Sequence, residues 1–385
     1  MTVSGRSRGF MLMGAVVLTV LTACSMSPTM ELAAPAASGC PARGLPRATT
    51  GPPDTLSLRW YRASVERDVR LSSSWCGTVG DDVFLESPSP AFPTWSGEGA
   101  LRVATWNYEV GAGRLLEFIG EELGLDCRGG GPLRADGVQP FVLLLQEAWR
   151  RSGDLPSVER NQLVPWTVDP ERQQPVLDVV GVARACGLAL LYVPSARNGP
   201  DDGPHADEDK GNAILSTLPL TAPIALELPF EAGRKVAVAA NVRAPGGERV
   251  RLVSAHLDVA STLFRTLVSG NQTRARQAKG LIDGLEKAER DGPLTGVVVV
   301  GGDFNSLAGN ESALKHMRAA FPQSPEWDGL PTWLPLSFPV DHIFFRRSGF
   351  TNFTIEGYRR IEEAYGSDHL GRRLEISYES ARARD

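Results

Sequence analysis

The sequence predicts an α/β domain in which sheets and helices pack in layers. Two continuous apolar runs, Phe141–Leu145 and Val297–Val300, are typical of central strands that are buried on both faces. Thr273–Arg290 places its apolar side chains on one face, as an amphipathic helix does. Long runs of predicted strands are interspersed with helices, and the sequence has no internal repeat. This order favours a layered α/β domain over a parallel array of strand–helix–strand units.

The composition is that of a globular protein. Of the 385 residues, 42% are hydrophobic and 22% are charged, which excludes a largely disordered chain and a coiled coil. The formal net charge is −5 and no polybasic block is present. The chain is therefore not an electrostatic coat for nucleic acid.

The first 23 residues have the pattern of an export signal. Arg6 and Arg8 precede the apolar stretch Gly9–Leu21, which is short of the roughly 20 residues that span a membrane comfortably. The segment Leu21-Thr22-Ala23-Cys24 is similar to a bacterial lipobox, in which the cysteine is lipidated and the preceding peptide is removed. We expect lipidation at Cys24 and an exported chain anchored to a bacterial membrane, on its periplasmic or cell-surface face. The alternative is an ordinary secretory signal with a chance cysteine.

The signal is followed by a segment that resembles a tether. Residues 24–54 are rich in Pro, Ala, Ser, Thr and Gly, and a flexible chain of this length has a reach of roughly 30 Å. Residues 55–385 are expected to form the folded domain, with its motif-bearing core at about 100–378. Within it, the strand-like Leu56–Arg62 belongs to a segment, 55–99, that we interpret as an extension packed on the domain.

From about residue 100 onward, apolar runs separated by turn signals define the elements. The first part has strands at Leu101–Trp106, Phe141–Leu145 and Ala189–Val193, with helices at Arg114–Leu123 and Val176–Cys186. Turns such as Ala244-Pro245-Gly246-Gly247 bound the following strands. These are expected at Asn212–Ser216, Pro223–Leu228, Lys235–Val242, Val250–His256 and Val297–Val300. A helix at Glu311–Phe321 precedes the closing strands at His342–Phe345, Phe350–Glu356 and Arg372–Tyr378.

The cysteines suggest a disulfide framework. Apart from Cys24, four remain, an even number that allows three connectivities in an exported chain. The helices ending near Cys127 and Cys186 are expected side by side on one sheet face, so we pair these two and leave Cys40 with Cys76. Free buried thiols are the alternative. The absence of a C-x-x-C pair disfavours a thiolate zinc site.

Polar and acidic residues recur where apolar strands end or begin. The segments are Thr105-Trp106-Asn107, Gln146-Glu147, His256-Leu257-Asp258, Gly302-Asp303-Phe304-Asn305, Asp341-His342 and Ser367-Asp368-His369. Because strand ends meet at one edge of a sheet, we expect a cleft that gathers carboxylates, carboxamides and two imidazoles. Oxygen donors of this kind are the ligands that Mg²⁺ prefers, and imidazoles beside them can position a phosphate and activate water.

Taken in order, and together with Gly211–Ser216, these motifs resemble the endonuclease/exonuclease/phosphatase superfamily, whose fold is deoxyribonuclease I-like. That superfamily includes AP endonucleases, neutral sphingomyelinases and inositol-polyphosphate phosphatases. The resemblance covers about residues 100–378. It implies a four-layer α/β sandwich, with two packed mixed β-sheets flanked by helices. It also implies a metal-dependent phosphoric ester hydrolase that uses Mg²⁺, with Mn²⁺ as an alternative, and water as the nucleophile.

The resemblance also implies roles for individual residues. Glu147 resembles the principal metal ligand, with Asn107 beside it and Asp368 near the metal. Asp303 and Asn305 resemble the pair that orients the attacking water and the phosphoryl group, and His256 resembles the imidazole that donates to a phosphate oxygen. His369, held by Asp341, resembles the pair that acts on water or stabilises the transition state; which of Asp303 and His369 is the base stays open. Glu109 is a further candidate metal-site acid.

Each of these residues also has a structural interpretation. Asn107 can cap a strand end and Glu147 can be an ordinary surface acid. Trp106 and His342 are expected to be core and wall residues. Asp258 is expected to pair with a neighbouring Arg, and His205, in the acidic loop 201–209, is expected to be solvated.

The substrate class is the open part of the functional prediction. A nuclease would line its rim with cations, for which the candidates are Arg234-Lys235, Arg265, Arg274, Arg276 and Arg346-Arg347. A phospholipid or sphingomyelin phosphodiesterase, or a phosphatase, of the same superfamily would present an apolar rim, such as Thr332–Phe338 or Leu263-Phe264. We expect a phosphodiesterase, nuclease first, with nucleic acid or phospholipid as substrate and the membrane reached through the lipid anchor. A non-catalytic lipoprotein that uses the fold as a binding module is the alternative of another class.

Overall fold

The description rests on a computed structural model of the chain. It describes residues 30–32, 58–96, 99–128, 135, 137–153, 155–156, 177–199, 205–259, 270–292, 295–348 and 353–378. Cys24, Cys40, Arg265 and Leu263-Phe264, all named above, lie outside these residues. Among the described residues, no helix combines the length and apolar character needed to cross a membrane.

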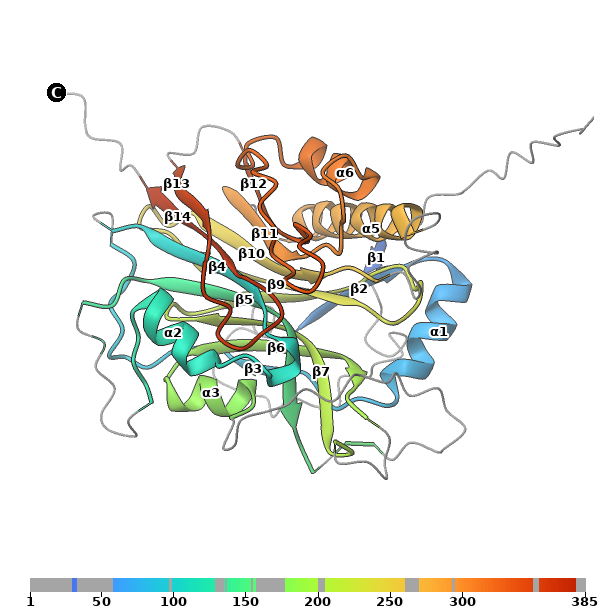
Figure 1. The fold of residues 1–385 in the computed structure, drawn as a ribbon, viewed down its shortest axis with the longest axis horizontal. Coiled ribbons are helices and arrows are strands. Elements are labelled where there is room, and N and C mark those ends of the chain that lie inside the picture. The colour runs from blue at the N-terminus through green and yellow to red at the C-terminus, as the bar shows by residue number, and fades with distance from the viewer. Residues whose placement is uncertain are drawn as a thin grey trace, which may run out of the picture.

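Two seven-stranded sheets form the centre of the domain (Figure 1). Sheet A contains, in spatial order, β1 (Met30–Leu32), β2 (Arg59–Ala63), β8 (Thr221–Glu227), β9 (Val236–Arg243), β10 (Arg249–His256), β11 (Val297–Asp303) and β12 (Asp341–Arg347). Sheet B contains β13 (Phe353–Arg360), β14 (Arg372–Tyr378), β4 (Leu101–Asn107), β5 (Phe141–Arg151), β7 (Glu208–Ser216), β6 (Ala189–Arg197) and β3 (Val83–Leu85). Both sheets are mixed, because β10 runs parallel to β11 and β4 runs parallel to β5, whereas most other neighbours are antiparallel.

Helices cover the outer face of each sheet and complete four layers (Figure 1). α5 (Gly270–Arg290) and α6 (Ser312–Ala320) lie on sheet A, while α2 (Leu115–Leu123) and α3 (Val179–Ala185) lie on sheet B. Three apolar clusters fill the spaces between the layers, one between the two sheets and one under each pair of helices. The predicted fold, a four-layer sandwich of two mixed sheets flanked by helices, is confirmed.

A buried polar contact joins the inner faces of the two sheets. Gln146 on β5 donates from Nε2 to Ser254 Oγ on β10 at 2.9 Å, and Ser254 in turn donates to the carbonyl of Leu145 at 2.8 Å. Both side chains are fully buried beside the apolar cluster between the sheets, where Thr105 Oγ1 also donates to Gln146 Oε1 at 3.3 Å. Because a buried polar group is costly when unpaired, this contact favours one alignment of the sheets over any shifted one.

The N-terminal part departs from the sequence analysis in two ways. Met30–Leu32 lie within the segment 24–54 that we expected to be a flexible tether, yet they form β1 and pair with Tyr61–Ala63 of β2. The segment 55–99 was expected to pack on the domain with a strand at Leu56–Arg62, and it does contribute β2, which pairs with β8, and β3, which pairs with β6. The departure is a helix, α1 (Glu66–Cys76), that the sequence analysis did not predict.

The expected acidic loop 201–209 ends earlier than predicted, because β7 already begins at Glu208. Glu208 and Asp209 are fully buried, and Asp209 forms an ion pair with Arg150 at 2.5 Å. His205 contacts Glu208 through Nδ1 at 3.0 Å and is 16% exposed in its side chain, so its expected solvation is wrong. The acids are buried here because a cation from a neighbouring strand compensates their charge.

Candidate active site

Three of the predicted site residues lie in one row at the edge of sheet A. His256 is the register partner of Asp303 across β10 and β11, and Asp303 is the partner of Asp341 across β11 and β12. β10 and β11 end at this row and β12 begins there, so the strand pairing alone brings the three side chains together.

Sheet B supplies the opposite half of the site. Asn107 ends β4, and Asp368 and His369 lie in the turn that leads into β14. Glu147 lies in β5 at a register shift between Leu145 and Ala148, with φ of 51°. A β-bulge redirects a side chain, and a positive φ outside glycine is strained, so the backbone at Glu147 is specially shaped. Asn305, after β11, has a similar φ of 50°.

One carboxylate oxygen of Asp303 lies at the meeting point of the two halves. Asn107 Nδ2 donates to Asp303 Oδ2 at 3.1 Å, and Nε2 atoms of His256 and His369 lie 3.6 and 3.9 Å from the same oxygen. The other oxygen, Oδ1, accepts a hydrogen bond from the Asn305 backbone at 2.8 Å. Four groups from four separate segments therefore surround a carboxylate that is 2% exposed.

His369 is held by Asp341. Its Nδ1 lies 2.8 Å from Asp341 Oδ2, and Asp341 is fully buried. Burial alone would lower the pKa of His369, but the charge and hydrogen bond of Asp341, with Asp303 and Asp368 nearby, outweigh it and raise this pKa to about 10. The ring is therefore protonated at neutral pH in the protein without a metal, with Nε2 3.7 Å from Asp368 Oδ1 and 3.9 Å from Asp303 Oδ2.

The other two titrating groups respond mainly to burial. Burial raises the pKa of Asp303 to about 7, with Asp341 adding to the shift and His369 opposing it. Burial also lowers the pKa of His256 well below its usual value, and the charges of Lys235 and Lys210 lower it further. His256 is therefore neutral at pH 7, whereas Asp303 is close to its midpoint.

Three acids form a second group on the sheet B side. Burial raises the pKa of Glu109, and repulsion from Asp368 and Glu147 raises it further, which shows that the three carboxylates share one region. Glu109 Oε2 accepts a hydrogen bond from the Asp368 backbone at 3.0 Å, and Asn107 Oδ1 accepts one from the Glu109 backbone at 3.1 Å. Clustered oxygen donors that repel one another fit a hard divalent cation. Asn107, Glu147 and Asp368 stay the predicted ligands of such an ion.

A tighter cluster of Asp303, Asp341 and His369 also exists, with one donor atom from each residue within 4.8 Å of the others. The Asp341–His369 hydrogen bond engages Asp341 Oδ2 and His369 Nδ1, whereas Asp341 Oδ1 has no hydrogen-bond partner. Among the described residues, Glu109, Glu147 and Asp368 do not come as close together as these three, so the cluster is a second candidate site for a cation.

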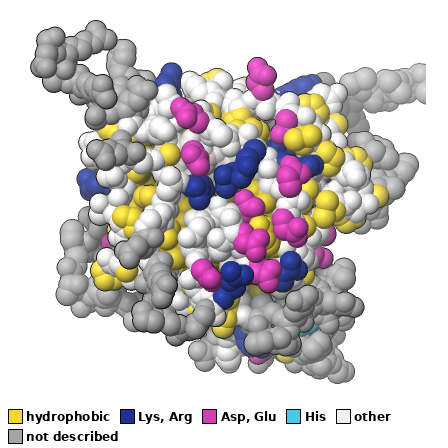
Figure 2. Space-filling model, turned by 60° about the vertical axis from the view of Figure 1, so that its left-hand side comes forward, with side chains coloured by type: hydrophobic (Ala, Val, Ile, Leu, Met, Phe, Trp, Pro, Cys, Tyr) yellow, Lys and Arg dark blue, Asp and Glu magenta, His cyan; other side chains and the backbone are white. Residues whose placement is uncertain are grey.

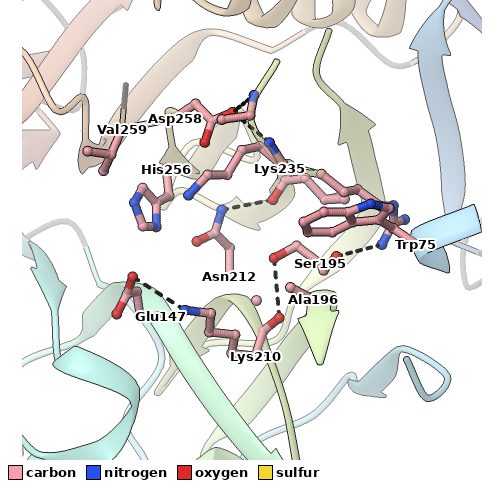
Figure 3. Close-up of a pocket in the computed structure, with 15 residues that line it drawn as sticks. Trp75, Glu147, Ser195, Ala196, Lys210, Asn212, Lys235, His256, Asp258 and Val259 are labelled. Atoms are coloured by element: carbon pink, nitrogen blue, oxygen red, sulfur yellow. Dashed lines mark hydrogen bonds and ion pairs between the residues drawn. The ribbon is translucent and has the colours of Figure 1, made fainter. Parts of the chain in front are cut away.

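A pocket of about 260 Å³ opens beside this site (Figure 3). Glu147 and His256 form its boundary with the site, and Trp75 and Val259 line it as well. Lys210 points from β7 toward Glu147, and the ammonium lies 3.8 Å from Oε1. Burial raises the pKa of Glu147, but the charges of Lys210, Lys235 and His369, with the Lys210 contact, together outweigh it, so this pKa lies below its usual value.

The sequence analysis missed Lys210. The signal was present, because Lys210 directly precedes Gly211–Ser216 and lies two residues from Asn212. Side chains two apart in a strand share a face, so the two line the pocket together. Trp333 was placed only on a possible rim, yet its Nε1 donates to Asp368 Oδ2 at 2.9 Å.

Several expected surface cations are structural instead. Arg234 and Arg274 are buried in ion pairs with Glu227 and Glu311, at 2.6 and 2.7 Å. Arg234 borders the pocket, but its guanidinium is already paired with Glu227, and Arg274 is not among the pocket residues. Of the remaining candidates in the described residues, Lys235 lines the pocket, Arg276 pairs with Glu231, Arg346 pairs with Glu289, and Arg347 donates to the carbonyl of Phe353.

The structure also places the residues for which we gave a structural interpretation. Trp106 is a core residue that donates to the carbonyl of His369 at 3.0 Å, and His342 is buried in the wall between Phe304 and Phe344. Asp258 was expected to pair with an arginine, but it accepts from the backbone of Ala232 and Gly233.

Cys127 and Cys186 are joined by a disulfide, the pairing that the sequence analysis expects, with Cα atoms 5.2 Å apart. The bond ties the segment after α2 to the end of α3. Cys76 is also disulfide-bonded, and its expected partner, Cys40, lies outside the described residues.

Comparisons with known proteins were made for the sequence and for the fold. The model of the Endonuclease/Exonuclease/phosphatase family matches residues 104–369, more than half of the chain. No curated protein sequence matches the chain.

Among solved structures, the human Nocturnin catalytic domain with bound sulfate anion is 17% identical, covers 78% of this chain and 97% of its own, and gives a TM-score of 0.49. An endonuclease/exonuclease/phosphatase from Beutenbergia cavernae DSM 12333 is 16% identical, covering 74% of this chain and 73% of its own, with a TM-score of 0.46. Sphingomyelinase C from Streptomyces griseocarneus is 15% identical, covering 72% and 99%, with a TM-score of 0.43. By its family match, the chain belongs to the endonuclease/exonuclease/phosphatase family of phosphoester hydrolases.

Proposed function

We propose that the chain hydrolyses a phosphodiester by in-line attack of water, with a divalent cation, Mg²⁺ or Mn²⁺, bound at the acids of sheet B. The observation that carries the proposal is the convergence of Asn107, His256 and His369 on Asp303 Oδ2, beside the cluster of Glu109, Glu147 and Asp368. The site thus joins a carboxylate poised near neutrality, a protonated imidazole and clustered oxygen donors.

Glu147, Asn107 and Asp368 would hold the cation, which stabilises negative charge on the phosphoryl oxygens when bound. His256 is neutral and lies beside Asp303, and its ring donates a hydrogen bond to a phosphate oxygen. Asn305, whose Nδ2 donates to the Leu257 carbonyl at 2.9 Å, keeps its own backbone amide on Asp303 and so fixes the carboxylate. Each of these groups is aimed before substrate arrives, which is the condition for effective electrostatic stabilisation.

Asp303 is the better candidate for the general base. Its raised pKa lets it accept a proton from water near pH 7, whereas His369, protonated through Asp341, has no free site to accept one. His369 then stabilises the charge that develops on phosphorus oxygens. This assignment is our proposal for the choice between Asp303 and His369 that the sequence analysis left open.

A nucleic-acid strand is the first substrate candidate. The support for it is local, since Lys210 and Lys235 line the pocket next to His256. We do not base this candidate on a broad cationic rim. The face in Figure 2 carries acidic and basic side chains side by side rather than a continuous basic patch. A short stretch of strand at the pocket therefore fits better than a long duplex held along a basic track.

A phospholipid is the second candidate, favoured by one observation. Leu334 and Leu336 are 47% and 53% exposed in the turn that follows Trp333, whose indole is bonded to Asp368. Exposed leucines beside a reaction centre suit a lipid surface better than a polar strand.

A substrate panel tests the function. Purified protein is assayed with Mg²⁺, with Mn²⁺ and with EDTA on bis-p-nitrophenyl phosphate, single-stranded DNA, RNA, sphingomyelin and phosphatidylinositol phosphates. We expect metal-dependent cleavage of bis-p-nitrophenyl phosphate and faster cleavage of an oligonucleotide. Undiminished turnover in EDTA would contradict the mechanism, and cleavage of the lipids alone would replace the first candidate by the second.

We also propose that Cys24 anchors the exported chain to a membrane through lipid, which rests on the lipobox pattern. Two acyl signals or more hold a protein stably at a bilayer, so wild-type protein from the producing cell should partition into the detergent phase. Cys24→Ala should appear in the aqueous phase or remain unprocessed. Equal partitioning of the two proteins would exclude the anchor.

A further inference from the structure

Two of the chain's lysines line one pocket. The sequence contains 40 lysines and arginines, of which five are lysines, and Lys210 and Lys235 both lie in the pocket beside the active site. Elsewhere the chain uses arginine for its buried ion pairs, as at Arg150, Arg234 and Arg274. A lysine is a compact charge on a flexible stem and can follow a ligand group, whereas arginine makes a fixed fork.

The pocket lies on one side of the reaction centre. Its lining includes Glu147 and His256, but Asp303 and His369 do not take part in it. From that boundary it extends over β7 and β9 to the indole of Trp75 (Figure 3). A group bound there is therefore a different group from the phosphate that is attacked. At about 260 Å³ the pocket is just below the range of roughly 300–1,000 Å³ that suits a whole drug-sized ligand, so it fits one part of a larger substrate.

The charges of the pocket leave one cation uncompensated. Glu147 is engaged by Lys210 at 3.8 Å, and Asp258 accepts two backbone N–H groups through Oδ2, at 2.7 and 3.0 Å. No carboxylate of the described residues lies within ion-pair distance of Lys235, which points toward His256 and Asn212 in Figure 3. A half-buried cation without a partner gains more from an anionic ligand than an exposed one does, because part of its hydration has already been given up.

Lys210 and Lys235 line the same pocket, and both are half-buried there. Two ammonium groups that share a pocket repel each other, and an anion bound between them relieves this repulsion. Ser195 lines the same pocket. Its hydroxyl donates to the Lys210 carbonyl at 3.2 Å, which ties the backbone of β7 to β6 beside the lysine.

We infer that Lys235 and Lys210 form a subsite for a second phosphate group of the substrate, next to the phosphodiester that is cleaved. The inference rests on the proposed phosphodiesterase function and narrows it: the preferred substrate carries two phosphates, as an oligonucleotide does. Trp75, which packs edge-on against Phe230 with ring centroids 5.5 Å apart, closes the far end and fixes how far the second phosphate can extend.

The test compares substrates with and without a second phosphate. The dinucleotide TpT has one phosphate, and TpT with a phosphate on its 5′ or its 3′ end has two. Wild-type kcat/KM should be about 10- to 100-fold higher for one of the two phosphorylated forms, since a hydrogen bond to a charged group is worth this much. In Lys235→Gln the ratio between the two substrates should fall toward one, and in Lys235→Arg most of the ratio should return.

The ratio is measured within each variant, so a general loss of folded protein cancels. Lys315→Gln is the matched control, because Lys315 is exposed on α6 and its loss should change neither the ratio nor the rate. A wild-type ratio near one, or a ratio that persists in Lys235→Gln, would overturn the subsite. If TpT and bis-p-nitrophenyl phosphate are both cleaved in either case, the proposed function stands without it, whereas no cleavage of any substrate would reject the function itself.

A second set of assays, with lipid substrates, tests whether the second phosphate belongs to a lipid headgroup. Vesicles with phosphatidylinositol are compared with vesicles that contain phosphatidylinositol 4-phosphate. A Lys235-dependent ratio in this pair, with none for the dinucleotides, would keep the phosphate subsite and assign it to a lipid headgroup.

Discussion

Asp303 and His369 form a buried acid–base pair whose two pKa values are set by different causes. Burial raises that of Asp303 to about 7, while Asp341 outweighs burial and raises that of His369 to about 10. In the mechanism that we propose, the active form therefore has Asp303 ionised and His369 protonated, at a pH between the two values. A bound cation would lower both pKa values, because its charge favours the ionised carboxylate and the neutral ring.

The first prediction is the pH dependence of kcat at saturating Mg²⁺. Activity should rise as Asp303 loses its proton and fall as His369 loses its own, which gives a bell-shaped profile. Asp341→Asn removes the main contribution that raises the pKa of His369, so the descending limb should move to lower pH. His369→Ala should lose about 10²- to 10⁴-fold in kcat.

If neutral His369 were the base instead, Asp341→Asn would shift an ascending limb. An unchanged profile in Asp341→Asn would separate His369 from catalysis, as would wild-type activity in His369→Ala.

The second prediction concerns Glu147. Glu147→Ala should abolish tight Mg²⁺ binding in calorimetry and nearly all turnover, because it removes the carboxylate that Lys210 and the bulge hold in place. Circular dichroism should report an intact fold. Glu286→Ala, an exposed acid of α5, is the control and should bind Mg²⁺ as wild type does. Retained Mg²⁺ affinity in Glu147→Ala would place the cation elsewhere.

At the scale of elements, the positions of the strands could be predicted from the sequence more readily than the roles of the arginines. The motif-bearing strands were located from sequence because apolar runs and their polar ends are local signals, and β4, β5, β10, β11 and β12 all place those ends at one edge. Arg234 and Arg274 were misassigned because their partners, Glu227 and Glu311, become neighbours only in the fold. α1 was missed because its apolar side chains are few, and it is fixed by tertiary contacts such as Trp75 with Phe230.

The third prediction tests how β10 and β11 set the site. A Cβ at Gly302 would collide with the carbonyl of Ala255, its register partner, so Gly302→Ala must push the two strands apart. Asp303 and His256 end these strands, and a misplacement of about 1 Å can cost about 100-fold in rate. We expect kcat to fall at least tenfold, and the melting temperature to fall as well.

Gly99→Ala is the matched control for this substitution, because nothing lies within 4 Å of a Cβ at Gly99. It should behave as wild type. A fully active Gly302→Ala would show that strand spacing does not limit the geometry of the site.

At the scale of the whole molecule, the sandwich divides its tasks between layers. The site is built where both sheets end, whereas the Cys127–Cys186 disulfide lies in the helical layer on the outer face of sheet B. The family and the layers were predictable because ordered motifs carry them. The pocket was not, since Trp75, Lys210 and Lys235 meet only after three distant segments have packed.

The fourth prediction follows from the position of the disulfide. The bond spans 59 residues, and loop closure of this length constrains the unfolded chain by about 4 kcal/mol in the chain-entropy model. Replacing both cysteines by alanine should therefore lower the unfolding free energy in urea by about 2–4 kcal/mol. kcat should stay at the wild-type value while the protein is folded. An unfolding free energy equal to that of wild type would mean that the bond does not contribute to stability.

The hydrogen bond between Gln146 and Ser254 fixes how sheet B is aligned with sheet A. Each sheet carries half of the reactive groups, so turnover reports the alignment of the halves and not merely their presence. On gentle heating or in dilute urea, a small shift of one sheet relative to the other would abolish activity, while the strand pairing within each sheet would be retained. Inactivation should then precede the loss of circular dichroism, and Ser254→Ala should widen the interval between the two events.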